Sequence, residues 1–393
     1  PEPDATAITE AASLLAKAKR PLILAGSGAA LSGAGAALRK LTTAYNIPIF
    51  ANALGRGLVP EDDNLSYSWP LANMSAGPAD VVLVLGMRLT QRMGYGLAPR
   101  FDKKAKFIQI DIEPEEIGRN RPIHLPIASD ARRAIELLHK ALNKLKAKPK
   151  AQPRWINKGL KPRLARIAEL ARSPKGGPIQ AFDMARAVTA HMPKNAIYAG
   201  DGADTQNWMH GFLRVRTERA FLDHYPVGCM GTALPLAVGA AAAAKEEALE
   251  SGKKARPVVL VSGDGAFGFY CSEINGAVQA GLPLIIVICN DGAWGTEKHG
   301  QIMQMGKVVN CELGHNDYQL IGEAYGALGL KVEDPADLDA TMKKAFKAVH
   351  NGPVVVNVVV DEMAGLVRKK EPLIQTISFS DLLAGQKAQY DLD

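Results

Sequence analysis

The sequence has little that would suit a membrane or secreted protein. No apolar run approaches the roughly 18 residues needed to cross a bilayer, and the longest, Leu282 to Cys289, suits a buried strand. The chain does not start with the basic and apolar segments of a secretory signal. Only four cysteines are present, and none forms a Cys-x-x-Cys pair. We therefore expect a cytoplasmic protein with reduced cysteines and no membrane partner.

Aromatic residues are scarce in the most basic part of the chain. The formal net charge is +7, and much of the excess lies between Lys140 and Lys175. Apart from Trp155, no aromatic side chain there offers a stacking platform for nucleic-acid bases. We interpret residues 151–177 as a solvated basic linker, and we expect no nucleic-acid partner.

The length of 393 residues favours two domains over one core. Strands and helices alternate on both sides of the linker, which predicts an α/β fold with two doubly wound parallel sheets. We place the first domain at 1–150, the second at 178–370, and a polar tail at 371–393. The expected strands are 20–25, 47–50, 81–85, 107–112, 196–199, 258–261, 284–289 and 354–360. The expected helices include 6–18, 130–145, 179–191, 233–249 and 267–280.

Two glycine-rich turns, Gly26-Ser27-Gly28 and Gly263-Asp264-Gly265, follow apolar strands, where open α/β sheets bind ligands. In the second turn, the glycines allow a tight bend, and the carboxylate stands at the end of the strand. The following helix directs free N–H groups to the same place, which favours a phosphate. The alternative is a plain turn with a helix-capping aspartate.

A second strand ends in Asn290-Asp291-Gly292, one helical crossover after the first. The two strand ends should therefore be neighbours, and the carboxylates of Asp264 and Asp291 should meet. Two oxygen ligands beside a helix terminus that favours phosphate predict a Mg²⁺–diphosphate site.

This paired pattern resembles the cofactor motif of thiamine diphosphate (ThDP)-dependent decarboxylases and carboligases, including acetolactate synthase and benzaldehyde lyase. The resemblance implies that Asp264, Asp291 and the backbone carbonyl of Ala293 hold the metal. Relatives usually carry Asn at the position of Asp291. Because Asp also supplies an oxygen ligand, we expect the metal site to persist. The resemblance assigns cofactor contacts to Gly228, Met230, Gly263, Asp264, Gly265, Ala266, Phe267, Asp291, Trp294 and Asp204.

Residues 224–231 are similar to the Gly-x-Met-Gly segment of acetolactate synthases and benzaldehyde lyases. In those enzymes a bulky side chain keeps the cofactor in a V shape, which would be the role of Met230. The Gly228 carbonyl and the Met230 N–H would bind the aminopyrimidine edge. The alternative for Met230 is a gap-filling role in the core.

The resemblance also assigns roles to Asp204, His299 and Gln301. Asp204 matches the family's diphosphate-side loop, with a helix-cap role as the alternative. His299 and Gln301 would border the substrate, and we count both among the candidate catalytic residues. An acid–base role suits His299, with a surface or packing role as the alternative.

Residues 1–150 are similar to the central domain of the same family, for example at Ile110-Asp111-Ile112-Glu113-Pro114. Acetolactate synthases hold FAD against this domain, and oxalyl-CoA decarboxylases hold ADP. Many relatives keep the fold without a ligand, so we do not expect FAD or ADP here.

Family members normally have a pyrimidine-binding domain before this point, which supplies a glutamate to the cofactor. We therefore expect a pyrimidine-domain polypeptide, or a lost or cleaved segment, to complete the site in a homo- or hetero-oligomer, as a dimer or tetramer. The leading hypothesis is decarboxylation and carboligation of a small 2-oxo acid, as in acetolactate synthase. The alternatives are a benzaldehyde-lyase-like C–C lyase acting on an aldehyde, a sulfoacetaldehyde-acetyltransferase-like enzyme and a non-catalytic cofactor-binding subunit.

Overall fold

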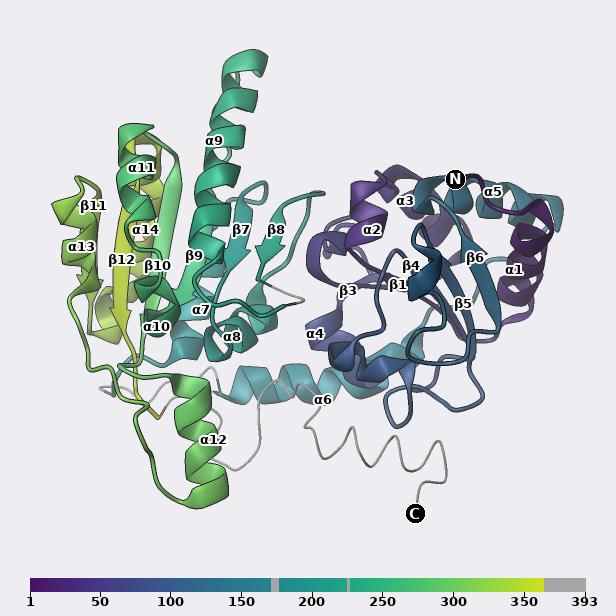
Figure 1. Ribbon diagram of the computed structural model, residues 1–393, viewed down its shortest axis with the longest axis horizontal. Helices are drawn as coiled ribbons and strands as arrows, with labels where there is room; N and C mark the ends of the chain where they lie inside the picture. The colour runs from purple at the N-terminus through teal and green to yellow at the C-terminus, as the bar shows by residue number, and fades with distance from the viewer. Residues whose placement is uncertain (171–176, 225–226, 364–393) are drawn as a thin grey trace. The chain divides into compact units, whose positions relative to one another are not determined.

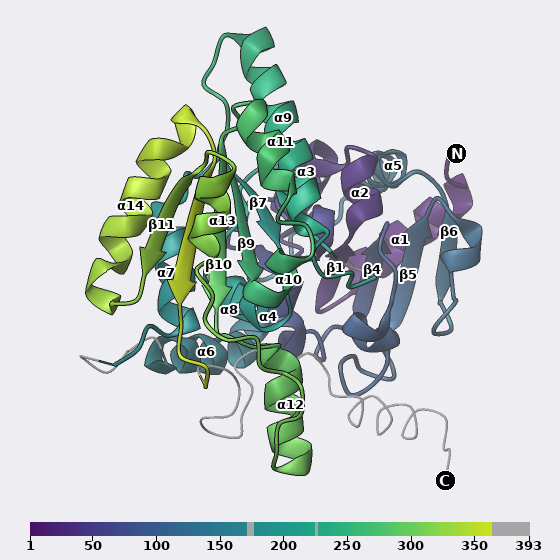
Figure 2. The ribbon, with the colours of Figure 1, turned by 60° about the vertical axis from the view of Figure 1, so that its left-hand side comes forward.

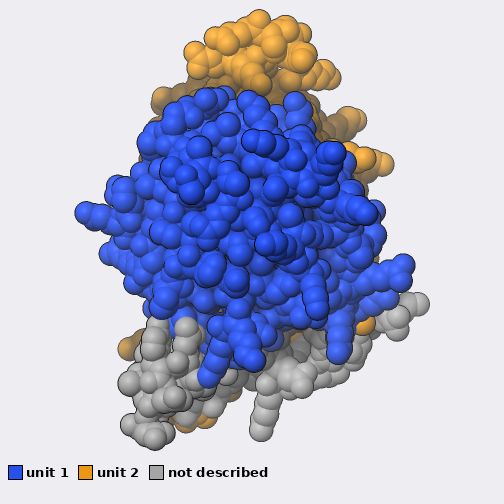
Figure 3. Space-filling view, turned by 90° about the vertical axis from the view of Figure 1, so that its right-hand side faces the viewer, with its two compact units in different colours: residues 1–164, 214–219, 375–393 blue, residues 165–213, 220–374 orange. Residues whose placement is uncertain are grey.

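The computed structural model describes residues 1–170, 177–224 and 227–363 (Figure 1). The chain divides into two compact units. The first holds residues 1–164 and 214–219, and the second holds the described residues of 165–213 and 220–363 (Figure 3). The predicted tail at 371–393 lies outside the described residues. No helix in the described part of the chain is long and apolar enough to cross a membrane.

The first unit contains a six-stranded parallel sheet in the order β3-β2-β1-β4-β5-β6. Its two central strands, β1 and β4, are buried at every position because helices cover both faces of the sheet. The strands are β1 (Pro21–Ala25), β2 (Ile49–Ala51), β3 (Ser66–Ser68), β4 (Val81–Leu85), β5 (Lys106–Asp111) and β6 (Leu125–Ala128).

Alternate residues of the central strands supply two separate cores. Ile23 and Leu83 point into the core shared with α1, α2, α3 and α5, while Leu22 and Val82 face the core that contains Trp69 of α4. The helices are α1 (Ala5–Lys17), α2 (Ser27–Leu31), α3 (Gly35–Tyr45), α4 (Trp69–Ala72), α5 (Ala131–Lys144) and α6 (Arg154–Leu170), with 3₁₀ helices η1 (Ala53–Gly55), η2 (Asn73–Ser75), η3 (Gln91–Gly96) and η4 (Pro114–Glu116).

The second unit contains another six-stranded parallel sheet, in the order β11-β12-β10-β9-β7-β8. The chain runs outward from β7 to β8 and then returns to β9 on the other side of β7, so the winding reverses between β7 and β9. The strands are β7 (Ile197–Gly200), β8 (Phe221–Asp223), β9 (Val258–Gly263), β10 (Leu284–Asn290), β11 (Leu328–Val332) and β12 (Val354–Val359).

Helices cover both faces of this sheet (Figure 2). α9, α11 and α13 pack on one face through a core that includes Ala237, Ile274 and Tyr318, while α7 contacts α8 and α14 on the other. The helices are α7 (Ala181–His191), α8 (Asp204–Phe212), α9 (Ala233–Ser251), α10 (Asp264–Gly268), α11 (Glu273–Gln279), α12 (Gly295–Met305), α13 (Tyr318–Ala324) and α14 (Leu338–Ala348), with 3₁₀ helices η5 (Pro335–Asp337) and η6 (Val349–Asn351).

The predicted α/β fold with two doubly wound parallel sheets is confirmed, and two local predictions need correction. The expected single helix at 267–280 is two short helices, α10 and α11, separated by a turn at 269–272. Much of the expected linker at 151–177 is the helix α6, and the division between the two units falls inside that helix, after Leu164. Residues 171–176 of that linker lie outside the described residues.

One ion pair in the first unit is almost completely buried. The Arg56 guanidinium donates to both carboxylate oxygens of Glu61, at 2.7 and 2.8 Å, and the two side chains are 0% and 1% exposed. The backbone N–H of Val215 also donates to Glu61, at 2.9 Å. Glu61 therefore fixes residues 214–219 to the first unit.

The first prediction concerns this pair. Glu61→Ala should lower the free energy of unfolding by about 3–5 kcal/mol, because it leaves the Arg56 charge buried without its partner. Glu2→Ala is the matched control, because Glu2 accepts from Arg133 at a similar 2.8 Å on the surface. Urea unfolding followed by circular dichroism would measure both variants. An unchanged midpoint for Glu61→Ala, as expected for the control, would contradict this view of the pair.

Candidate functional site

The site lies at the carboxyl ends of β7, β9 and β10, where the winding of the second sheet reverses. This is the place at which open α/β sheets bind ligands. A small cavity of about 60 Å³ opens there. The predicted site residues that line it are Asp204, Met230, Gly263, Asp264, Gly265, Ala266, Asp291, Ala293 and Trp294.

Asp264 follows β9 directly and is the first residue of α10. Asp264 is buried, with only 2% of the residue's surface exposed. The N–H of Gly265 donates to Oδ1 at 2.8 Å, while Oδ2 is buried without a hydrogen-bond partner among the residues that the structure describes. Burial raises the pKa of Asp264 to about 8, and the nearby charge of Asp291 adds to this rise. A buried carboxylate oxygen with no donor is suited to a cation.

Asp291 follows β10 and faces the same cavity. Its Oδ1 accepts a long hydrogen bond from the N–H of Ala293, at 3.3 Å. Burial raises the pKa of Asp291 to about 6, the Ala293 N–H opposes this rise, and the charge of Asp204 adds to it. The strand ends thus bring together like charges that repel each other unless a proton or a cation neutralises them.

These residues fit a hard divalent cation such as Mg²⁺, which prefers oxygen ligands. The described residues hold no group of three or more His, Cys, Asp or Glu side chains placed around one metal position. A cation held by Asp264 and Asp291 would therefore take its remaining ligands from the backbone or from a bound molecule. Ala293, to which the family resemblance assigns a carbonyl ligand, lines the same cavity.

Glycines bring the backbone close to this cavity. A Cβ atom at Gly265 would lie 2.5 Å from the Trp294 ring, so only glycine lets the indole pack against the start of α10. A Cβ atom at Gly295 would lie 2.4 Å from the Asp291 carboxylate and 3.3 Å from that of Asp204. Gly295 was not among the predicted site residues, although a glycine two residues after Ala293 could have indicated a close approach of the backbone to the site.

Asp204 supplies a third carboxylate, paired with His299. The Asp204 Oδ2 lies 2.9 Å from Nδ1 of His299, and Nε2 of that ring lies 3.2 Å from the carbonyl oxygen of Glu362. Burial alone would lower the pKa of His299, but the hydrogen bond and charge of Asp204 raise it overall. Asp204 is the first residue of α8, whose N-cap is Ala203, and its carboxylate contacts His299.

Met230 lines the cavity and is 38% exposed, which does not suit a gap-filling residue of the core. Gly228 precedes it with φ of +79°, in the left-handed region that favours glycine. Residues 225–226 of the same segment lie outside the described residues. The structure thus leaves the Met230 side chain available to a bound molecule.

Two predicted residues are engaged elsewhere. The Gln301 side chain donates to the carbonyl of Val309 at 3.2 Å and accepts from its N–H at 2.6 Å, so it secures the segment after α12. Phe267 is buried and packs edge-on against Tyr318. Neither lines the cavity, nor does His299 or Gly228.

Asp201, which was not singled out within the predicted diphosphate-side loop, is buried and organises the β7 side of the site. Asp201 accepts from the N–H of Gly202 at 2.8 Å and from the N–H of Ala233, the first residue of α9, at 3.0 Å. It also lies 3.8 Å from His224. Its position in Gly200-Asp201-Gly202, a second Gly-Asp-Gly turn at a strand end, was the available signal.

Both units match models of one protein family. Residues 8–138 match the model described as "Thiamine pyrophosphate enzyme, central domain", and residues 201–358 match "Thiamine pyrophosphate enzyme, C-terminal TPP binding domain". The first match includes all six strands of the first sheet, and the second begins directly after β7 and includes every residue of the cavity.

Curated proteins of several activities are similar to the chain. A 2-hydroxyacyl-CoA lyase of Arabidopsis thaliana is 31% identical over 371 residues, which are 91% of this chain and 62% of the relative. A probable acetolactate synthase large subunit of Methanococcus aeolicus is 29% identical, over 91% of this chain and 61% of the relative. An oxalyl-CoA decarboxylase of Escherichia coli (strain K12) is 31% identical, over 91% and 62%. The chain thus spans about three-fifths of the length of these relatives.

A solved structure shares the fold. The crystal structure of benzoylformate decarboxylase from Polynucleobacter necessarius superposes with a TM-score of 0.72 at 22% identity, over 92% of this chain and 65% of the other.

The second prediction follows from the two carboxylates. Because the folded-state pKa values of Asp264 and Asp291 lie above the ordinary 3.8, the metal-free chain binds protons more tightly when folded. Its stability should therefore fall as the pH rises from about 4 to about 8, and added Mg²⁺ should reverse the loss.

Asp264→Asn should raise the free energy of unfolding of the metal-free chain at pH 8 by on the order of 1–2 kcal/mol, because it removes one of two repelling charges. It should also flatten the pH dependence. Chemical unfolding at several pH values measures both effects, and Asp339→Asn, an exposed change on α14, is the control. A variant less stable than the unaltered chain at pH 8 would contradict the prediction.

Proposed function

Because the chain belongs to the family of thiamine pyrophosphate-dependent enzymes, we propose that its second unit binds thiamine diphosphate through Mg²⁺. We also propose that it serves the breaking or making of a C–C bond next to a carbonyl. The observation that carries this proposal is the pair of carboxylates at the reversal point of the sheet, the buried Asp264 and the half-buried Asp291, both with raised pKa values. One oxygen of this pair has no protein donor among the described residues, and the repulsion favours a divalent cation.

Each residue of the cavity has a role in this proposal. Asp264, Asp291 and the Ala293 carbonyl would hold Mg²⁺, which in turn would neutralise a diphosphate. The Trp294 ring lines one wall of the cavity and would exclude water from the metal ligands. Met230 is exposed at the rim and would support the rings of the cofactor. Bound thiamine diphosphate supplies an electron sink for cleavage of a bond next to a carbonyl.

His299 positions Asp204 in this proposal. With Nδ1 on Asp204 and Nε2 near the Glu362 carbonyl, both ring nitrogens already have protein partners. A protonated ring would donate to both and compensate the third carboxylate beside the metal ligands. The candidate acid–base role of His299 would thus be exerted on the protein and not directly on the substrate.

The substrate is a carbonyl compound, and two classes have support. The leading candidate is a 2-oxo acid, decarboxylated and joined to a second carbonyl, as the name of the Methanococcus aeolicus relative suggests. The second is an acyl-CoA compound, since two relatives at 31% identity are named 2-hydroxyacyl-CoA lyase and oxalyl-CoA decarboxylase.

We further propose that a pyrimidine-binding domain outside residues 1–393 completes the site, in another polypeptide or in a longer form of this one. Two observations support this. The cavity of about 60 Å³ is far smaller than the roughly 300 Å³ or more typical of a cofactor pocket. The relatives are also longer than this chain. The assembly would be a homo- or hetero-oligomer.

The third prediction tests cofactor binding. Calorimetric titration should show thiamine diphosphate binding that requires Mg²⁺ and is lost in Asp264→Ala, because this change removes a metal ligand. Asp339→Ala should bind like the unaltered chain, since its side chain is 60% exposed on α14. Binding that is unaffected by Asp264→Ala or by removal of Mg²⁺ would refute the proposed metal site.

An assay of catalytic turnover distinguishes an enzyme from a non-catalytic cofactor-binding subunit. The chain with thiamine diphosphate and Mg²⁺ should be inactive alone and become active toward a 2-oxo acid when a pyrimidine-domain polypeptide is added. Activity of the isolated chain would contradict the proposed completion of the site.

The fourth prediction concerns His299. His299→Ala should weaken Mg²⁺–thiamine diphosphate binding by about tenfold, because Asp204 then adds an uncompensated negative charge beside the diphosphate. The double variant His299→Ala with Asp204→Asn should recover most of the loss. His315→Ala, which removes a half-exposed imidazole near Glu362, is the control. If the double variant binds no better than His299→Ala, the ring does not act through Asp204.

A further inference from the structure

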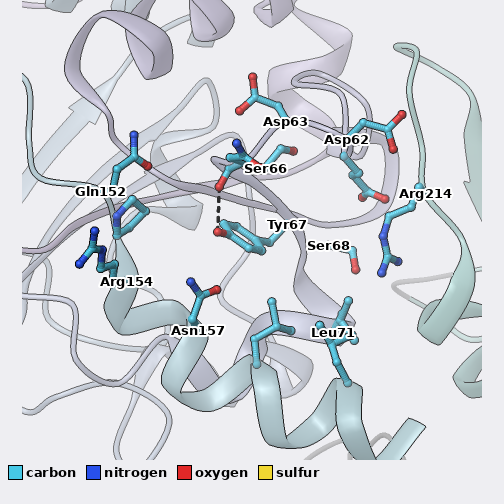
Figure 4. A pocket seen from close by; sticks show the side chains of 15 residues that line it. Asp62, Asp63, Ser66, Tyr67, Ser68, Leu71, Gln152, Arg154, Asn157 and Arg214 are labelled. Carbon is cyan, nitrogen blue, oxygen red and sulfur yellow. Dashed lines mark hydrogen bonds between the residues drawn. The ribbon is translucent and has the colours of Figure 1, made fainter. Parts of the chain in front are cut away.

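One strand of the second sheet carries a polar residue among apolar ones. β12 reads Val-Val-Val-Asn-Val-Val, and its Asn357 is 0% exposed. Asparagine is unfavourable in strands, and burying an amide is costly unless it is hydrogen-bonded. The polar residues Ser66 and Ser68 of β3 line a cavity of about 460 Å³ in the first unit (Figure 4), whereas Asn357 lines neither that cavity nor the one at the cofactor site. The Asn357 amide therefore bonds to other groups of the protein.

The hydrogen bonds of Asn357 connect three parts of the second unit. Its Oδ1 accepts from Nδ2 of Asn290 at 3.1 Å. Its Nδ2 donates to the carbonyl oxygen of Asn316 at 3.0 Å and to Oε1 of Gln319 at 2.9 Å. The amide thus joins the end of β10, the segment before α13 and α13 itself, which are 67, 41 and 38 positions away in the sequence.

Asn290, the last residue of β10, extends this connection to the cofactor site. It is 0% exposed and directly precedes Asp291. Its Nδ2 also donates to the Asn316 carbonyl at 3.0 Å, and its Oδ1 accepts from the N–H of Gly292 at 3.3 Å. The Asn316 carbonyl therefore accepts from two buried amides at once, and one of these amides also holds the loop that contains Asp291.

A segment after α12 lies along the loop that follows β10. We call residues 291–294 the site loop and residues 311–316 the brace. Three backbone hydrogen bonds join them: the N–H of Trp294 donates to the carbonyl of Cys311 at 2.8 Å, and the N–H groups of Leu313 and Gly314 donate to the carbonyl of Gly292 at 2.7 and 2.9 Å. Asn316 ends the brace, so the amides of Asn290 and Asn357 anchor the same segment that is bonded to the site loop.

The pairing with the brace directs the Ala293 carbonyl away from it. Ala293 lies opposite Glu312 in an antiparallel bridge. The hydrogen bonds of this bridge are made by Gly292 and Trp294, the residues on either side of Ala293. The site loop is thus held on both sides of the carbonyl that the proposed site gives to the metal, while that carbonyl accepts no bond from the brace.

We propose that Asn357 is a positioning residue for the metal site, acting through Asn290 and the brace. A shift of the brace would break the two buried hydrogen bonds to the Asn316 carbonyl, and the brace fixes the residues on either side of Ala293. Asn357 thereby sets the direction of the Ala293 carbonyl from outside the cavity. The inference rests on the proposed Mg²⁺ site and adds a residue of β12 to it.

The fifth prediction compares two variants of this amide network. Asn357→Val removes the bonds to Asn290 and Asn316, and valine suits a strand of valines. Binding of Mg²⁺–thiamine diphosphate to the 393-residue chain, measured by calorimetry, should weaken at least about tenfold, as for other residues that orient metal ligands. Gln319→Leu is the matched control, because it removes only the third partner of Asn357 and leaves Asn290 and Asn316 in place. It should bind like the unaltered chain.

Amide hydrogen exchange tests the brace without a metal. In the metal-free Asn357→Val chain, the amides that hold the site loop should exchange at least about tenfold faster relative to the amide of Val258, because only the former lose their anchor. The N–H of Val258 donates to the Pro283 carbonyl at 2.9 Å elsewhere in the same unit. A general loss of stability would speed both alike, so the ratio reports on the brace alone. The reporter amides are those of Gly292, Trp294, Leu313 and Gly314.

The outcomes separate this inference from the proposed function. Absence of Mg²⁺-dependent binding in the unaltered chain would refute the proposed function, and the exchange ratio would still show whether Asn357 holds the site loop. If the unaltered chain binds, three results would each overturn the positioning role: equal binding by Asn357→Val, equal losses in Asn357→Val and Gln319→Leu, or an unchanged exchange ratio. If thermal unfolding shows that Asn357→Val does not fold, Asn357→Ser, whose side chain is too short to reach both partners, takes its place with the same expected results.

Discussion

The repulsion between two carboxylates governs the second unit. Asp264 and Asp291 are brought together because β9 and β10 are parallel neighbours, with Cys289 opposite Gly263 in register. Asp264 is buried and Asp291 half-buried, and the charge of Asp291 raises the cost of charging Asp264. A fold optimised for stability alone would carry Asn at one of these positions. If the second unit binds a divalent cation as proposed, keeping both acids would couple folding to cation binding, since the ion would remove the penalty that the metal-free chain bears.

The two sheets reverse their winding in the same way but differ in what occupies the reversal point. In the first unit, a Cβ atom at Gly28 would lie 2.9 Å from the Cα atom of Gly86, and the Gly28 N–H donates to the Gly86 carbonyl at 2.9 Å. Backbone packing thus explains this glycine-rich turn without a ligand. In the second unit, a Cβ atom at Gly202 would lie 3.4 Å from the backbone nitrogen of Gly263, and a cavity opens beside these two glycines.

Much of the fold could be predicted because the central strands are apolar at every position. β1, β4, β9 and β10 are fully or almost fully buried, and their sequences predicted them. The prediction missed β3, β6, β8 and β11, which are three to five residues long and contain polar or exposed residues. The helix expected at 267–280 failed for a related reason. Phe269 and Tyr270 lie in the turn against Gly231, a tertiary contact that helix periodicity does not encode.

The site shows the same division between local and tertiary information. Asp264 and Asp291 could be located because strand ends and crossover length are local properties. The pairing of Asp204 with His299 could not, because the two residues are 95 positions apart and meet only when α8 and α12 are placed. The contacts of Gln301 are local, yet they depend on the course of the chain after α12.

The effect of His299 on the charge of the site therefore depends on the Asp204 carboxylate that it faces. A neutral imidazole would leave three acids around one small cavity, whereas a protonated ring leaves two, the number that a divalent cation neutralises. In the proposed site the net charge would thus depend on a residue outside the cavity, because a protonated His299 would offset the charge of Asp204 while a divalent cation would offset those of Asp264 and Asp291.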